Sequence, residues 1–180
     1  MRGIVGGSGL GRIVVRWSFV GSLVTGLGSS AGVAAGGDVS QLPQRPALED
    51  KIPDLKRARQ GARERLGEPR CLAVLTDFES VNGGRLDQVL RATGRTAQQQ
   101  LDHLVFESGL GRPLCDRRVS LAFTQIHSPM VSICLRPFTL LPRQEQEAVL
   151  IHEMLHSLGL GENPPTSQKI TERVVARCRP

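Results

Sequence analysis

Two histidines one helical turn apart, with a glutamate beside the first, are the residues of this sequence best suited to chemistry. They are His152 and His156, and Glu153 directly follows the first. Side chains four residues apart point to the same side of a helix, so the two imidazoles can bind one metal ion. Imidazole is a preferred ligand of zinc, and a catalytic zinc site has three protein ligands and one open position. Glu153 would lie beside the ion, where its carboxylate can act as a general base toward water.

The composition around this motif favours the metal-site interpretation. Glu153 carries the only formal charge between Ala148 and Gly161. Three polar side chains on an otherwise apolar helix are costly to bury unless each has a partner. A chance arrangement on an ordinary core helix is therefore the less favoured interpretation.

The stretch from His152 to His156 resembles the zinc-binding helix of the zincin metallopeptidases. Gly159, three residues after the second histidine, is similar to the glycine at which the metzincin branch leaves this helix, and the third ligand of that branch falls on Glu162. The resemblance covers residues 148–162. It departs from the branch because Glu162 stands where His is usual, and because no Met follows for the Met-containing turn. A carboxylate oxygen is still an acceptable zinc ligand.

The third ligand has a second candidate. Glu172 resembles the glutamate that thermolysin-like enzymes supply from a later helix, although its spacing from the motif is short for that arrangement. We favour Glu162, since the predicted turn at Gly159 would bring it back to the metal directly.

The resemblance implies a zinc metallopeptidase, a hydrolase with one zinc ion and a peptide or protein substrate. His152, His156 and Glu162 would bind the ion, and the glutamate between the histidines would pass a proton from water to the departing amine. The chain has no Tyr, so His127 or Arg136 is the candidate for stabilising the oxyanion. The alternative from another class is a non-catalytic secreted binding domain with a structural zinc.

The elements that must position these residues follow from the apolar pattern. Helices are predicted over residues 55–66, 86–108 (in two pieces broken near Gly94), 143–158 and 167–178, and strands over 71–78, 119–124 and 130–135. Together with the resemblance, they predict an α+β, zincin-like domain: a small mixed or antiparallel sheet packed on the active-site helix, with a C-terminal helix. The strand at 130–135 is expected at the sheet edge, where a substrate would bind as an added strand.

The first 35 residues differ in kind from the rest. They contain three Arg and no acidic residue, and an uncharged run over residues 17–35 ends in Gly-Val-Ala-Ala. This pattern predicts a secretory signal peptide, residues 1–35, cleaved after Ala35. An uncleaved anchor is the alternative, but Gly and Ser interrupt the run. Residues 36–52 are interpreted as a flexible leader before the zincin-like domain at 53–180, so the expected product is extracellular or periplasmic, without a stable membrane anchor.

The charge pattern does not favour nucleic acid as a partner. Three of the 23 basic residues fall in the predicted signal peptide, which lowers the net charge of the remainder from +6 to +3. Basic and acidic residues are interleaved over residues 63–70, as on a solvated helix face. Beyond residue 35 the chain has neither Tyr nor Trp on which bases could stack. We expect a monomer that binds peptide or protein substrates.

The four cysteines predict two disulfides in an oxidising compartment. They are Cys71, Cys115, Cys134 and Cys178. Three pairings are possible. Cys115–Cys134, between neighbouring strands, and Cys71–Cys178, tying the last helix to the sheet, are favoured. A four-cysteine zinc site would need closely spaced pairs, and the sequence has none.

Overall fold

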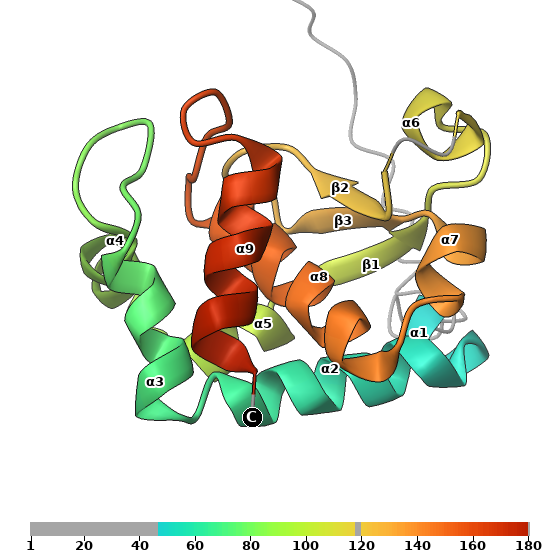
Figure 1. Ribbon diagram of the computed structural model, residues 1–180, viewed down its shortest axis with the longest axis horizontal. Helices are drawn as coiled ribbons and strands as arrows, with labels where there is room; N and C mark the ends of the chain where they lie inside the picture. Colours follow the sequence, from blue (N-terminus) through green and yellow to red (C-terminus); the bar gives the residue numbers. More distant parts are fainter. Residues whose placement is uncertain (1–46, 118–119, 180) are drawn as a thin grey trace, which may run out of the picture. The chain divides into compact units, whose positions relative to one another are not determined.

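The computed structural model describes residues 47–117 and 120–179, and it has an α+β fold (Figure 1). Its elements in chain order are α1 (Leu48–Lys51), α2 (Pro53–Arg65), α3 (Pro69–Leu72), the 3₁₀ turn η2 (Ala73–Thr76), α4 (Leu86–Ala92), α5 (Ala97–Asp102), β1 (Val105–Ser108), α6 (Pro113–Asp116), β2 (Ala122–Thr124), β3 (Met130–Ile133), α7 (Leu135–Thr139), α8 (Arg143–Ser157) and α9 (Ser167–Cys178). Over these residues no helix combines the length and apolar character needed to cross a membrane. The predicted signal peptide, residues 1–35, lies outside the described residues and stays a prediction.

A three-stranded mixed sheet has the order β1-β3-β2. β3 pairs parallel with β1 and antiparallel with β2, with Ala122 opposite Ile133. β3 is therefore the central strand, and Val131 and Ile133 are fully buried. The prediction that residues 130–135 form the edge strand is wrong. The edge beside α8 is β2, because strand order is set by pairing in space and not by nearness along the chain.

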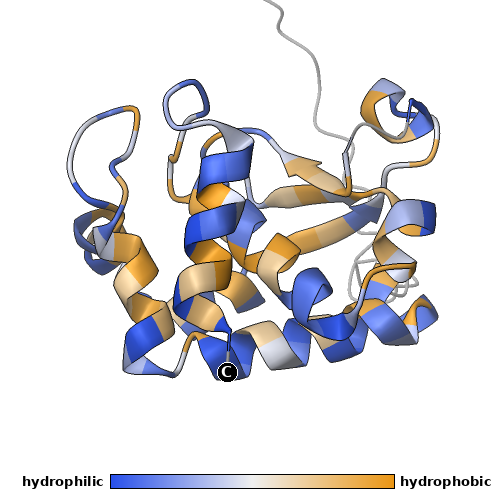
Figure 2. Cartoon of the chain, viewed as in Figure 1, coloured by the Kyte–Doolittle hydropathy of each residue, from blue (hydrophilic) through white to orange (hydrophobic). Residues whose placement is uncertain are grey.

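Helix α8 is the element on which the two other long helices pack. It packs against α2, α9 and β2, and Figure 1 shows α9 alongside it and α2 along the lower edge of the view. Leu150, Ile151, Met154 and Leu155 have no exposed surface. Figure 2 shows hydrophilic residues on the outer sides of α2 and α9 and hydrophobic ones over much of the sheet. The histidines of α8 thus project from a helix that packing holds on several sides.

Three of the predicted helices, over residues 55–66, 143–158 and 167–178, are confirmed with small shifts of their ends. They are α2, α8 and α9. In α9 the side-chain oxygen of Thr166 accepts a hydrogen bond from the backbone N–H of Lys169, which caps the first turn. The break predicted near Gly94 is also confirmed, since Gly94 has a φ of +71° between α4 and α5.

Several short elements differ from the prediction. Residues 71–78 form α3 and η2 instead of a strand, because Pro69 begins a helix that packs with η2 against α9. The end of the predicted helix 86–108 is strand β1, and Leu135 begins helix α7. Within the predicted leader, residues 48–51 form helix α1, and Leu48 and Ile52 pack against the core. A short apolar run fits a buried helix as well as a strand, so the pattern alone could not separate the two.

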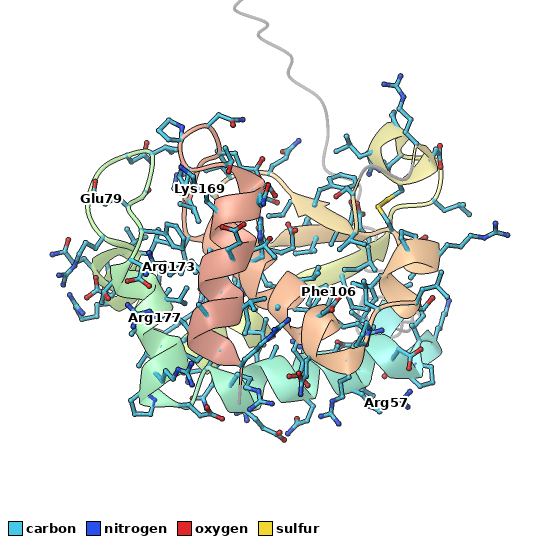
Figure 3. All side chains as sticks on the ribbon, viewed as in Figure 1. Arg57, Glu79, Phe106, Lys169, Arg173 and Arg177 are labelled. Atoms are coloured by element: carbon cyan, nitrogen blue, oxygen red, sulfur yellow. A yellow bond between two sulfur atoms is a disulfide. The ribbon has the colours of Figure 1, made fainter. Side chains whose placement is uncertain are left out.

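Both favoured disulfides are present. Cys71–Cys178 joins α3 to the end of α9, and Cys115–Cys134 joins α6 to the residue after β3; disulfides are drawn in yellow in Figure 3. The pairings are as predicted, but neither links two strands nor ties a helix to a strand. Two disulfides indicate that the protein folds in an oxidising environment.

Candidate metal centre

The last two turns of α8 bring two imidazoles to one point. The Nε2 atoms of His152 and His156 are 3.0 Å apart. An oxygen of Glu162 is 3.7 Å from the first nitrogen and 3.3 Å from the second. Each histidine is 6% exposed, whereas the carboxylate reaches the surface. These three residues could hold a metal ion.

The distances between these atoms fit a small tetrahedral ion. Zinc–nitrogen and zinc–oxygen bonds of about 2.0–2.2 Å in tetrahedral geometry place ligand atoms about 3.3 Å apart. The three separations of 3.0, 3.3 and 3.7 Å lie on both sides of that value. Among the described residues, no fourth His, Cys, Asp or Glu joins the cluster.

Gly159 returns the chain to the histidines. Its φ is +101°, and its N–H donates to the carbonyl of His156 over 2.9 Å. A Cβ at this position would collide with the ring of His127 and the hydroxyl of Ser80. Glycine tolerates both the left-handed conformation and the close approach. The turn expected at this position from the sequence is therefore present, and it brings Glu162 to the cluster.

The outer nitrogen, Nδ1, bonds a carbonyl oxygen in one histidine and a hydroxyl in the other. His156 Nδ1 lies 2.7 Å from the carbonyl oxygen of Leu160, and His152 Nδ1 lies 3.0 Å from the hydroxyl of Thr171 on α9. Such partners orient a metal-binding imidazole, and the carbonyl, which only accepts, also selects the nitrogen of His156 that carries the proton. Thr171 was missed by the sequence analysis. Its only signal is its place beside the apolar stripe of the last helix, next to Ile170.

Burial moves the pKa values of two groups in opposite directions. Burial, followed by the charge of His156, lowers the pKa of His152 to about 3. Burial, followed by the charge of Glu162, raises the pKa of Glu153 to about 8, although a hydrogen bond from the backbone N–H of Thr124 opposes this. Both effects disfavour the charged form of a buried group.

Glu153 has a buried oxygen that no group in the described part of the chain satisfies. The residue is 4% exposed, and its Oε2 has no hydrogen-bond partner there. A buried carboxylate oxygen is costly unless a proton, a water or a cation neutralises it. The donor set and this uncommitted oxygen together fit a cation with a water beside it.

A cleft of about 750 Å³ gives access to the cluster. Strand β2 and the residues that follow it, up to Ile126, form one wall, and His152, Glu153, His156 and Glu162 also line it. A second cavity of about 320 Å³ is lined by His152 and Glu153 as well, together with Val149 and Thr171. Glu153 therefore lines both cavities.

The remaining candidate residues lie elsewhere. Glu172 is exposed on α9, where it accepts a hydrogen bond from Gln168 over 2.8 Å, and it is not in the metal cluster. Neither His127 nor Arg136 lines the cleft. The backbone N–H of His127 donates to the carbonyl of His156 over 3.0 Å, so this residue supports the exit of the helix.

Comparison with known proteins adds no family name. No family model matches the chain, no curated protein matches it, and no solved structure matches it. The zincin-like interpretation therefore stays a prediction, which rests on the motif over residues 148–162 and on the geometry of the metal centre.

Proposed function

We propose that this protein is an exported zinc metallopeptidase with a zincin-like fold. The observation that carries the proposal is the convergence of His152, His156 and Glu162 beside a buried, uncommitted oxygen of Glu153 in an open cleft. The two histidines and Glu162 would hold one zinc ion. When bound, zinc would polarise the substrate carbonyl and lower the pKa of water.

Glu153 would move the proton in this reaction. Its carboxylate takes a proton from the attacking water as the oxygen adds to the peptide carbonyl carbon, and then gives it to the leaving nitrogen as the C–N bond breaks. The hydrogen bond from the backbone N–H of Thr124 orients this carboxylate. Its second oxygen, Oε2, is then free to take the proton.

The free edge of β2 suits an extended peptide. The carbonyl of Leu121 accepts a hydrogen bond from the N–H of Cys134, and β2 continues this antiparallel ladder with β3. In such a ladder, the backbone N–H and C=O groups of every second residue point away from the partner strand. In β2 these residues are Ala122 and Thr124, so their backbone groups point to the free edge. The N–H of Thr124 already bonds Glu153. We therefore propose that the substrate pairs with Ala122, next to the general base.

The walls of the cleft favour uncharged side chains in the substrate. Leu114 and Ile126 line it, each 44% exposed, and so does Phe123. Of the described lining residues, only members of the metal centre are ionisable. A charged substrate side chain beside the scissile bond would lose hydration without gaining a partner.

The place of action follows from two features together. Two disulfides need an oxidising compartment, and residues 1–35 have the composition of a secretory signal peptide. We therefore propose export to the cell exterior or the periplasm.

The test combines zinc analysis with hydrolysis of an uncharged peptide library. Glu153→Gln should keep its zinc and lose about 10²- to 10⁴-fold in kcat/KM, since a positioned general base contributes that much. Glu162→Gln should lower zinc content, whereas Glu172→Gln, the matched control, should change neither zinc content nor hydrolysis. A strong chelator should abolish hydrolysis, and added zinc should restore it.

Two results would contradict the proposal. Equal cleavage by the wild type and Glu153→Gln would remove the general base. Bound zinc without turnover of any peptide, and with the fourth coordination position closed, would instead identify a binding domain with a structural zinc.

A further inference from the structure

The two histidines differ in what their outer nitrogens can bond. The partner of His156 Nδ1 is the carbonyl oxygen of Leu160, which can only accept a hydrogen bond. The partner of His152 Nδ1 is the hydroxyl of Thr171, which can either donate or accept one. The proton of His156 is therefore fixed on Nδ1, and that of His152 is not.

The two inner nitrogens, the Nε2 atoms, lie so close together that the position of each proton decides whether they attract or repel each other. His156 Nε2 carries a lone pair, because a neutral imidazole has one N–H and His156 uses it at Leu160. His152 Nε2 lies 3.0 Å away. Two lone pairs at this distance repel each other, so either a proton or a cation must lie between them.

Without a cation, a continuous chain of hydrogen bonds satisfies both rings. The hydroxyl of Thr171 donates to His152 Nδ1, His152 Nε2–H donates to His156 Nε2, and His156 Nδ1–H donates to Leu160. With a cation bound to both Nε2 atoms, His152 must carry its proton on Nδ1. The hydroxyl of Thr171 then accepts from it instead.

We propose that Thr171 is a positioning residue that lets His152 change tautomer when the metal binds. The metal-free protein holds His152 as the Nε2–H form, and the metal-bound protein holds it as the Nδ1–H form. One proton leaves Nε2 for solvent and one is taken up at Nδ1, so the ring stays neutral. Thr171 lines a cavity of about 320 Å³, which gives the protons a route. This inference rests only on the metal site of the proposed function.

We expect the hydroxyl of Thr171 to give a metal affinity between that of a carboxylate and that of an apolar residue at this position. A carboxylate at position 171 would fix Nδ1–H and leave two lone pairs facing each other in the metal-free protein, a repulsion that metal binding would relieve. An apolar residue would remove the hydroxyl that accepts from Nδ1–H once the metal is bound. Thr171 avoids both costs, so the metal-free protein keeps its hydrogen bonds while the site remains ready to bind.

The tautomers can be read directly from nitrogen chemical shifts. The whole chain, labelled with ¹⁵N at histidine and freed of metal at pH 8, should contain His152 as the Nε2–H form and His156 as the Nδ1–H form. One equivalent of zinc should convert His152 alone. Replacing His103 and His127 by Gln, one at a time, identifies their signals. Finding His152 as the Nδ1–H form in the metal-free protein would overturn the inference.

Substitutions at position 171 separate a tautomer role from a structural one. Thr171→Ser should keep the zinc affinity, measured by competition with a chromophoric chelator, and Thr171→Val should lower it about 10- to 100-fold. Thr171→Asp should bind zinc more tightly and, without metal, shift His152 to the Nδ1–H form. Glu172→Gln, a change at the adjacent residue of α9, should alter neither readout. A Thr171→Val protein that binds zinc as the wild type does would refute the proposal.

These readouts need no peptide substrate. If the chain binds zinc but hydrolyses nothing, the peptidase proposal fails and this inference stands. If it hydrolyses peptides while His152 keeps Nδ1–H without metal, this inference alone fails.

Discussion

At the scale of single residues, His152 and Glu153 are neighbours with opposite shifts in pKa. Burial is the main cause of both shifts: it lowers the pKa of His152 to about 3 and raises the pKa of Glu153 to about 8. Without a cation, both groups are therefore neutral over the range between these values. A bound cation would favour the Glu153 carboxylate, the form that a general base needs.

The shift of Glu153 predicts how the stability of the metal-free protein depends on pH. Its pKa rises from 4.5 unfolded to about 8 folded, so between these values the folded state binds the proton and the unfolded state does not. Unfolding then releases a proton, and the free energy of unfolding falls as pH rises through this window. Gln does not titrate, so Glu153→Gln should gain stability over the wild type by up to about 1.4 kcal/mol per pH unit.

Urea unfolding with a chelator present, from pH 5 to pH 8, measures this difference. The titration of His152 occurs in both the wild type and Glu153→Gln, so it cancels from the difference in their free energies of unfolding. A stability difference that stays constant over this range would contradict the shift.

At the scale of elements, Gly159 connects helix α8 to Glu162, the third residue of the candidate metal cluster. Gly159→Ala should lower the free energy of unfolding by about 1–3 kcal/mol, because the new Cβ meets His127 and Ser80 in a left-handed backbone conformation. It should also weaken zinc binding, since Glu162 would be displaced. Chelator competition and urea unfolding measure the two effects.

Gly94→Ala is the matched control for this change. Gly94 also has a positive φ, +71°, but a Cβ there would meet nothing within 4 Å. It should cost some stability and leave the zinc affinity unchanged. Wild-type zinc affinity in Gly159→Ala would show that the turn does not position Glu162.

The sequence predicted the part of this centre that is local along the chain. His152 and His156 follow from the helical repeat and Glu153 from its place beside the first histidine, whereas Glu162 came from the resemblance to the metzincin branch at Gly159. Long helices were predictable because their apolar repeat and caps are also local. Strands of three or four residues depend on their partners in space, so β1 was missed and β3 was wrongly given the edge.

The contacts that the sequence analysis missed join segments far apart in the chain. Thr124 lies on β2 and Thr171 on α9, yet they bond Glu153 and His152 of α8. No spacing rule connects these segments, because their proximity arises only when β2 and α9 pack on α8. A single sequence has no local pattern that reports such a contact.

At the scale of the whole molecule, the Cys71–Cys178 disulfide fastens the last helix to the first half of the domain. It spans 107 residues, and Arg177, labelled in Figure 3, adds two hydrogen bonds of 2.8 Å to Asp77. Replacing both cysteines by Ala should lower the free energy of unfolding by about 2–5 kcal/mol, because a crosslink over a long loop restricts the unfolded chain.

Urea unfolding of this double variant measures the loss. The same change at Cys115 and Cys134, which closes only 19 residues, is the comparison and should cost less. An equal or larger loss at the short loop would contradict this account.

Helix α9 carries a crosslinked cysteine at its end and the hydroxyl partner of His152 near its start. In a reducing compartment the Cys71–Cys178 disulfide would not form. Helix α9 would then be held less firmly, and its Thr171 would orient the imidazole of His152 less well. Maturation would then have a fixed order, with oxidation first and metallation second. Under the proposed function, such an order would keep the protein without its metal, and so inactive, until the disulfide has formed.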